Sequence, residues 1–185
     1  MRRLISISML LAVLFAGSYV GYQLITGNFH TVVPGELYRS GQLGPARLAQ
    51  YVHRYAIRTV INLRGHNPGK KWYHDEVAEA ASLGVVHLDF KMSAHSDFTV
   101  NQARQIIRIM KDAPKPILIH CEGGADRSGL VAAIYLVANH DGGENAAESE
   151  LSPLYGHFAV PGLSKAYAMD KSWESLEPFL GIKNS

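Results

Sequence analysis

The stretch PILIHCEGGADRSG, residues 116–129, decides the fold of this chain. It begins as a short apolar run, typical of a buried strand, and ends in a turn rich in glycine and other small residues. Cys121, the only cysteine, stands where the run meets the turn, and an apolar helix-like segment follows at residues 129–140. A strand, a glycine-rich turn and a helix in this order point several backbone N–H groups at one spot, at the positive end of the helix dipole.

Short β-branched segments alternate with longer amphipathic ones around this stretch. Residues 59–64 (TVINLR) and 85–90 (VVHLDF) are expected strands. Further helices are expected at residues 71–84, 99–113, 144–151 and 163–180, the second of which opens with a capping-box pattern, TVNQ. This alternation predicts an α/β fold with a central, mostly parallel sheet flanked by helices.

The residue types in the turn are those that anion binding and sulfur chemistry require. Gly123 and Gly124 permit the backbone angles of a tight turn, whose amides can surround a tetrahedral oxyanion. Arg127 adds a planar, two-pronged donor for two phosphate oxygens, which a lysine cannot match. The same positive field favours the nucleophilic thiolate of Cys121, and Ser128 can donate to the sulfur.

Cysteine, five residues, arginine and then serine or threonine, preceded by histidine, is the motif of the cysteine-dependent phosphatases. The chain therefore resembles the protein tyrosine and dual-specificity phosphatase superfamily, most of all its small bacterial and fungal members. Two upstream blocks of these members, LYRSGQ and INLR, occur in order at residues 37–42 and 61–64, and Gly156-His157 stands in the usual downstream place. The resemblance covers residues 29–158. It implies a phosphatase-type fold and chemistry without a metal or another cofactor.

The resemblance also assigns roles within the turn. Cys121 is expected to attack phosphorus, Arg127 to hold the phosphate oxygens and Ser128 to help the sulfur leave. The expected substrate-binding residues are His120, Glu122, Gly123, Gly124, Ala125, Asp126 and Arg127. Within this set, His120 either orients the loop or is a satisfied core histidine. The Glu122 carboxylate should point outward, because it would repel a phosphate.

A phosphate ester needs its departing oxygen protonated, and a carboxylic acid normally supplies that proton. Three aspartates are candidates. Asp126 lies inside the turn, and the part of the superfamily with an Asp-Arg-Ser or Asp-Arg-Thr ending is thought to use this residue. Asp97 ends a polar segment, residues 92–97, that is a natural place for a mobile active-site loop. Asp89 has a spacing close to that in dual-specificity phosphatases, but it falls in an expected strand.

Two arginines in the upstream blocks are secondary candidates. Arg39 and Arg64 end expected strands, where each either touches the substrate or packs against the turn. His95 in the polar segment is a third. Lys70 and Lys71 follow an Asn-Pro-Gly turn and are expected to form a solvated face.

Composition restricts the partners and the class of protein. A chain of 185 residues is long enough for one domain with a sizeable core. With 18 basic and 16 acidic residues the charges of the chain nearly balance, so its composition does not indicate a nucleic-acid partner. A single cysteine excludes an internal disulfide framework and a thiolate-rich metal site, and the sequence contains no metal-ligand cluster.

The N-terminal residues form a separate unit. Arg2 and Arg3 precede residues 4–25, which contain no charged side chain. As a helix at ~1.5 Å per residue this run would reach roughly 33 Å, enough to cross a hydrocarbon core of ~30 Å. We therefore expect residues 1–27 to be a membrane anchor or signal segment and residues 28–185 to be the cysteine-dependent phosphatase domain.

An uncleaved anchor is the favoured prediction, because the run stays apolar beyond a small-residue cleavage site at residues 16–18. With the two arginines held inside, the phosphatase domain would lie outside the cytoplasm, in the periplasm of a bacterium. The alternative is a secreted protein released by cleavage of a signal peptide.

The function predicted from the sequence is hydrolysis of phosphate monoesters through a phosphocysteine intermediate. Phosphotyrosine in a protein is the expected substrate, with phosphoserine and phosphothreonine next. The alternatives are a phosphatase of phosphoinositides or other small phosphate esters, and a weakly active phosphate-binding module. A sulfurtransferase is a further rival, but its chemistry needs no Arg-Ser pair at this spacing.

Overall fold

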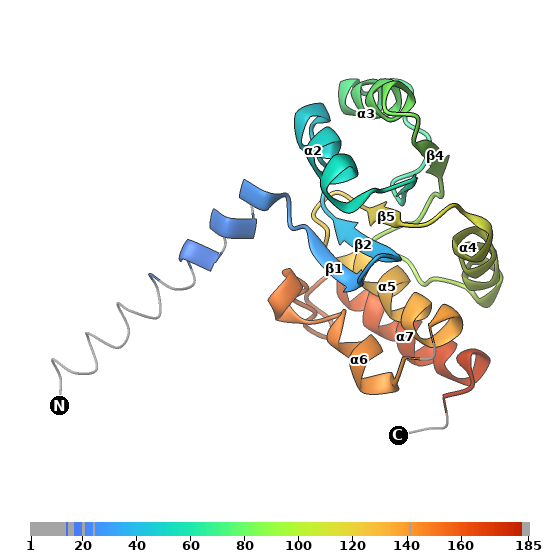
Figure 1. Cartoon of the computed structure of the whole chain (residues 1–185). Coiled ribbons are helices and arrows are strands. Elements are labelled where there is room, and N and C mark those ends of the chain that lie inside the picture. Colours follow the sequence, from blue (N-terminus) through green and yellow to red (C-terminus); the bar gives the residue numbers. More distant parts are fainter. Residues whose placement is uncertain (1–13, 15–16, 20, 24, 141, 183–185) are drawn as a thin grey trace, which may run out of the picture.

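The computed structural model describes residues 14, 17–19, 21–23, 25–140 and 142–182. They form an α/β domain with a five-stranded sheet in the order β1-β2-β5-β3-β4 (Figure 1). The strands are β1 (His30–Val33), β2 (Leu37–Ser40), β3 (Thr59–Asn62), β4 (Val86–Asp89) and β5 (Ile117–His120). Only the edge pair β1 and β2 is antiparallel, and the other three pairings are parallel. The prediction of a mostly parallel sheet flanked by helices is confirmed.

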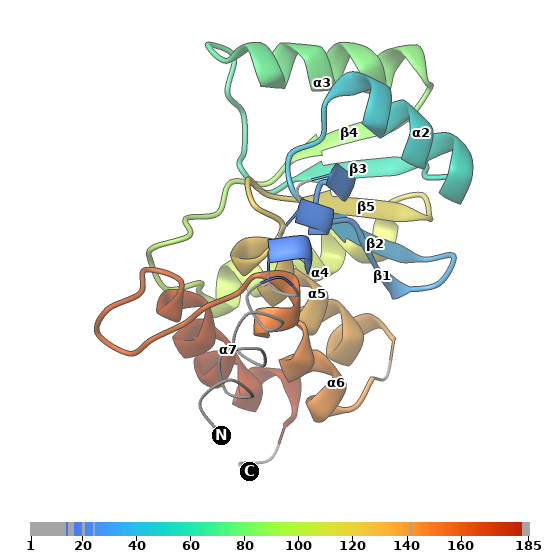
Figure 2. The same cartoon turned by 90° about the vertical axis from the view of Figure 1, so that its left-hand side faces the viewer.

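Helices cover both faces of the sheet (Figure 2). They are α2 (Pro45–Tyr55), α3 (Lys71–Ser82), α4 (Val100–Asp112), α5 (Asp126–Asn139), α6 (Glu144–Ser149) and α7 (Tyr167–Leu180), with a 3₁₀ turn η1 (Pro153–Tyr155) between the last two. Helices α2 and α3 pack on one face and α4, α5 and α7 on the other. Helix α5 is apolar almost all round and is buried at the centre of the larger core, as its composition predicts.

The expected strands and helices are present, with two shifted helix starts. Helix α5 begins at Asp126, three residues earlier than the apolar pattern indicates, so the polar end of the turn is already its first turn. Helix α7 begins at Tyr167, because the preceding residues form turns. The capping box of α4 is present as predicted: Thr99 and Gln102 bond to each other's backbone N–H groups.

Strand β1 and helix α2 were not predicted. Helix α2 has clear signals all the same: Pro45 stands in its first turn, and Ala56 ends it in the left-handed conformation. Leu48, Tyr51 and Val52 form its buried face. Strand β1 is only four residues long and has no strong alternation, so it depends on its pairing with β2.

The predicted apolar span, residues 4–25, falls largely outside the described residues. Within this span, the described residues 17–19, 21–23 and 25 are helical. In the described part of the chain, no helix is both long enough and apolar enough to cross a membrane.

Candidate active site

The cysteine loop, residues 121–127, lies at the carboxyl end of β5, the central strand of the sheet. Ligands of open α/β sheets bind outside the carboxyl ends of the strands, which is this edge. Cys121 is 3% exposed, and its N–H donates to the carbonyl oxygen of Ser40 at 3.3 Å. The positive end of the α5 dipole follows directly, so the loop lies in a field that favours anions.

The loop and the LYRSGQ block approach each other so closely that glycine is required on both sides. Gly124 has a φ of +75°, and a Cβ there would lie 2.4 Å from the backbone nitrogen of Gly41. A Cβ on Gly41 would in turn lie 3.1 Å from the carbonyl oxygen of Glu122. For Gly123 the expectation was wrong, because its φ is not positive and a Cβ would meet nothing within 4 Å. Only Gly124 supplies the unusual backbone angle.

The sulfur of Cys121 has two polar neighbours. The N–H of Gly124 donates to Sγ at 3.2 Å, and the hydroxyl oxygen of Ser128 lies 3.5 Å from Sγ. Ser128 is fully buried in the first turn of α5, so its hydroxyl is held beside the sulfur. Both polar groups therefore contact the atom that would attack phosphorus.

Arg127 extends from the first turn of α5 towards the segment that precedes α4. Its Nη1 lies 3.5 Å from the carbonyl oxygen of Met92. Its Nε is buried and has no hydrogen-bond partner among the described residues. An unsatisfied buried donor is costly, and an oxygen of an anion held in the cysteine loop would satisfy it.

Arg39 supports the loop from behind and does not face the substrate side. Its side chain is completely buried, and Nη2 donates to the carbonyl oxygens of Gly124 at 2.9 Å and Ala125 at 2.8 Å. Nη1 pairs with the Glu150 carboxylate at 2.5 Å. Two carbonyls of the loop are thereby turned towards Arg39, so the N–H groups of Ala125 and Asp126 in the same peptide planes point away from it. Of the two roles left open for Arg39, packing against the loop is the one observed.

His120 belongs to a buried network that we call the Glu76 network, made of Glu76, His120, His87 and Gln42. The Nε2 atoms of His120 and His87 lie 3.0 and 2.9 Å from the same oxygen of Glu76, and Gln42 donates to its other oxygen at 2.5 Å. Burial opposes ionisation of Glu76, but these hydrogen bonds outweigh it and lower its pKa to about 2. His120, the strand residue directly before Cys121, is therefore a satisfied core histidine. Its hydrogen bond with Glu76 fixes its position.

Asp126 belongs to a second network, the His157 network, made of His157, Asp126 and Asp170. Nδ1 of His157 lies 2.7 Å from Asp126, and Nε2 lies 2.9 Å from Asp170. Burial works against the charged imidazolium, but the bonds with the two carboxylates outweigh it and raise the pKa of His157. The Asp126 side chain is 33% exposed, whereas the His157 ring is buried.

The other two aspartates lie elsewhere. Asp89 ends β4, where it accepts hydrogen bonds from Asn62 at 2.9 Å and from the Tyr73 hydroxyl at 2.5 Å. Burial of Tyr73, together with this bond, raises the pKa of the phenol to about 12. The Asp89 carboxylate is thus hydrogen-bonded to neighbouring groups at the end of a strand, which is a structural role. Asp97 is 66% exposed and lies 3.6 Å from Lys171 on α7. The structure thus brings only Asp126 into the cysteine loop.

The mouth of the site carries further polar groups. Arg64 stacks over the Trp72 ring, 3.7 Å from its centroid, and donates to Gln42 at 2.9 Å. Gln42 in turn donates its backbone N–H to the carbonyl of Glu122, whose side chain is exposed. A cavity of about 240 Å³ opens here and is lined by Gln23, Gly27, Asn28, Gly41, Gln42, Glu122 and Gly123.

His95 and the two lysines lie apart from the cysteine loop. His95 lines a different cavity, beside Asp97 and Lys171. Lys70 and Lys71 are exposed at the start of α3, and Lys71 pairs with Asp75. The expected solvated face is present there.

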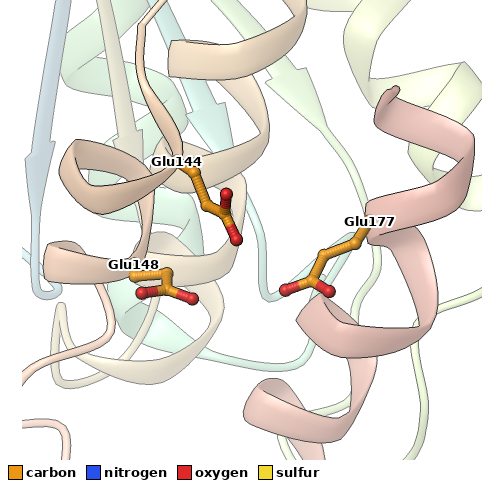
Figure 3. Close-up of side chains that lie close together, drawn as sticks. All are labelled: Glu144, Glu148 and Glu177. Carbon is orange, nitrogen blue, oxygen red and sulfur yellow. The ribbon is translucent and has the colours of Figure 1, made fainter. Parts of the chain in front are cut away.

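Three carboxylates lie together between α6 and α7. Glu144 and Glu148 on α6 and Glu177 on α7 point towards one another (Figure 3), with one oxygen of each within 4.8 Å of the others. Among the described residues this is the one group of metal-ligating side chains that lies so close. Burial, then repulsion from the neighbouring glutamates, raises the pKa of Glu177. Exposed acidic groups of this kind are common without an ion, so we assign no function to it.

Sequence reasoning missed the residues that hold the acid and the loop. His157 was noted only for its place in the family pattern, although it stands in residues 151–164, a segment without Asp, Glu, Lys or Arg. That isolation was the available signal. Asp170 and Glu76 gave no such signal, because each is only one of several charged side chains on an amphipathic helix. Asn28, whose amide donates to the carbonyl of Gly123 at 2.9 Å, was also missed.

Several solved structures share this fold. TpbA from P. aeruginosa is 22% identical, with a TM-score of 0.60 over 83% of this chain and 91% of TpbA. The core catalytic domain of the PP-IP phosphatase SIW14 from S. cerevisiae is 19% identical, with a TM-score of 0.59 over 85% and 94% of the two chains. PTPMT1 is 14% identical, with a TM-score of 0.60 over 84% and 99%. At these identities the likeness establishes the fold alone.

Family membership comes from the sequence itself. No protein of curated function matches the sequence significantly. The sequence profile described as the tyrosine phosphatase family matches residues 19–141, which include both upstream blocks and the cysteine loop. The chain therefore belongs to the tyrosine phosphatase family and is a phosphoric monoester hydrolase.

Proposed function

We propose that this phosphatase hydrolyses phosphotyrosine in proteins through a phosphocysteine intermediate on Cys121. The observation that carries the proposal is the surroundings of Sγ, with the Gly124 N–H at 3.2 Å and the Ser128 hydroxyl at 3.5 Å at the start of α5. A thiolate in this position is stabilised and still nucleophilic. Arg127 lies beside it with a buried donor that a phosphate oxygen would satisfy.

The reaction takes two steps. The thiolate of Cys121 attacks phosphorus, the bond to the leaving oxygen breaks, and Asp126 gives that oxygen a proton. Water then attacks the phosphocysteine and loses a proton to Asp126, while the S–P bond breaks and its electron pair returns to sulfur. Inorganic phosphate leaves. The loop amides and Arg127 hold the equatorial oxygens in both steps, and Ser128 stabilises the departing thiolate.

Asp126 is the proposed acid because it stands in the cysteine loop and its side chain is one-third exposed. Nδ1 of His157 lies 2.7 Å from the Asp126 carboxylate and fixes its position. After the first step the Asp126 carboxylate is free to accept the proton of the attacking water. Asp97 is the alternative acid, because its segment also contains Met92, whose carbonyl touches Arg127.

Phosphotyrosine is supported as the substrate by the family and by one structural neighbour. TpbA has been solved in complex with pTyr. A second class, phosphoinositides, is the alternative, since PTPMT1 has been solved in complex with PI(5)P. A panel of phosphotyrosine, phosphoserine and inositol phosphates, tested on the purified protein, separates these classes by rate.

We propose further that residues 4–25 anchor the chain in a membrane, with the domain of residues 28–185 outside the cytoplasm. The support is the sequence: two arginines precede an uncharged run that continues to Ile25. Retention of Met1 and resistance to a carbonate wash are the expected results. An N-terminus near residue 19 in a soluble fraction would show the secreted alternative.

Cys121→Ser tests the mechanism. The hydroxyl fits the same loop but is a poor nucleophile at neutral pH, so we expect turnover of phenyl phosphate to fall by about 10⁴-fold or more. Phosphate binding by calorimetry and the melting temperature should stay near those of the wild type, which separates lost chemistry from lost structure. Ser128→Ala, which keeps the sulfur, should lose far less. Retained turnover in Cys121→Ser would exclude the phosphocysteine intermediate.

A further inference from the structure

Exposed apolar side chains gather on one side of the domain. Eight large hydrophobic residues are exposed among the described ones, and seven of them lie within residues 14–25 and 154–163. Leu163 is 86% exposed and Leu154 67%. The eighth, Val86, lies apart on β4. Isolated exposed apolar residues are ordinary, whereas a gathered set marks a surface that contacts a protein or a membrane.

The two apolar segments touch each other and the cysteine loop. Gln23 donates to the carbonyl of Leu154 at 3.1 Å. Asn28 donates both to the carbonyl of Tyr155 and to that of Gly123 in the loop, each at 2.9 Å. Figure 2 shows the helical N-terminal residues leaving the domain on this side, which also bears the segment after α6. The apolar segments therefore lie next to the cysteine loop, which they reach through Asn28 and Gly123.

The chain has no linker between the apolar run and this side. Only Thr26 and Gly27 separate residues 4–25 from Asn28, which is 6% exposed and bonded to the cysteine loop. If residues 4–25 enter a bilayer, the domain cannot stand away from it. The surface around the point of exit, residues 154–163, would lie against the lipid.

The charges around the apolar segment fit an anionic bilayer. Residues 151–164 contain no Asp, Glu, Lys or Arg. Directly beyond them, Lys165 and Lys171 line a cavity of about 350 Å³ together with Leu163 and Asp97. Asp97 lies 3.6 Å from Lys171, so Lys165 is the cation that this acid leaves for a headgroup. Apolar side chains bordered by ammonium groups are typical of proteins that lie in the membrane interface, where the cations contact anionic headgroups.

We propose that residues 154–163 form a membrane-docking surface that lies in the headgroup region of an anionic bilayer. Docked in this way, the cysteine loop lies close to the membrane surface, where phosphate groups are carried. This consequence for the substrate rests on the proposed phosphatase activity, whereas the docking itself does not. The other occupants of such a surface, a second copy or a protein partner, are outcomes of the test.

Quenching by brominated lipid tests the docking. The full chain is reconstituted into vesicles of phosphatidylcholine and phosphatidylglycerol, with or without bromine on the acyl chains. Leu163→Trp adds a fluorophore to the surface, and Val86→Trp adds a matched one on β4. We expect the emission added by Leu163→Trp to lose most of its intensity in brominated vesicles, and that added by Val86→Trp to keep it. Equal responses of the two variants would overturn the proposal.

Two further outcomes would overturn it as well. Emission from Leu163→Trp that ignores bromine but changes with the ratio of protein to lipid would assign the surface to contacts between copies. Recovery of the protein in the aqueous phase, with its N-terminus cleaved near residue 19, would remove the anchor on which the geometry depends.

An activity arm separates docking from catalysis. Leu154→Ser combined with Leu163→Ser should lower hydrolysis of a phosphatidylinositol phosphate in the same vesicles about tenfold, because apolar area no longer enters the interface. Hydrolysis of soluble phenyl phosphate should be unchanged. A wild type inactive on phenyl phosphate would contradict the proposed function and leave the quenching result to decide docking. A wild type active on phenyl phosphate whose double variant keeps the full vesicle rate would contradict docking.

Discussion

Two buried networks flank the cysteine loop, and they are built in opposite ways. In the Glu76 network one carboxylate lies between two histidines, whereas in the His157 network one histidine lies between two carboxylates. Burial disfavours the central charge in both, and in both the partners outweigh it: the pKa of Glu76 falls to about 2 and that of His157 rises. In each network the partners thus favour the charged form of the central group.

The networks differ in their access to solvent, and this difference separates structure from chemistry. Glu76 and its partner His120 are almost fully buried. In the other network the Asp126 side chain is one-third exposed. We infer that the first network holds the strand before Cys121 and the second supplies a proton to the reaction.

Removing the exposed end of the His157 network gives the largest expected effect. Asp126→Asn should slow hydrolysis of phenyl phosphate by ~10²–10⁴, the usual cost of losing a general acid. It should slow nitrophenyl phosphate far less, because that leaving group departs without a proton. Steady-state rates on the two esters give the ratio.

Asp97→Asn is the control for this experiment, since its side chain is also an exposed aspartate. It should show a weak effect that does not depend on the leaving group. If the two variants behave the other way round, the proton comes from the segment before α4. If both lose activity equally on every ester, Asp89 would be tested next.

Removing the centre of the Glu76 network should cost stability. Glu76→Ala leaves one buried donor, on His120, and two half-buried donors, on His87 and Gln42, without this acceptor, and we expect a loss of about 3 kcal/mol in the free energy of unfolding. Glu79→Ala, on the same helix but outside the network, is the matched control and should cost less than about 1 kcal/mol. Urea unfolding followed by circular dichroism measures both. Equal losses would show that the network contributes nothing specific.

The pH dependence of stability should show the two networks separately, with the smallest effects. The lowered pKa of Glu76 contributes stability that is present above its unfolded value of 4.5 and is lost as the pH falls towards 2. The raised pKa of His157 contributes stability that is full below 6.5 and is lost as the pH rises through the folded value. Glu76→Gln should flatten the acid limb alone, and His157→Gln the alkaline limb alone. A variant that changes the opposite limb would contradict the assignment.

The sequence by itself determined the sheet class and the cysteine loop. The alternation of strand and helix patterns predicted parallel strands, because consecutive parallel strands need crossover connections, which are usually helices. The loop was predictable because its requirements are local: a strand end, the Gly124 turn, Arg127 in the first turn of α5 and Ser128 beside Cys121 lie within one short stretch. Local spacing fixes local geometry.

The tertiary structure decided which side chains reach that loop from elsewhere. Arg39 lies on β2 and became a buried support of the loop only through the pairing of β2 with β5. His157 follows η1 and meets Asp126 at the start of α5 and Asp170 on α7 only in the folded chain. Such contacts join residues far apart in the chain, and a single side chain gives no sign of its partner. These contacts form because each buried polar group needs a hydrogen-bond partner. Which partner it finds is decided only once the core has brought the elements together.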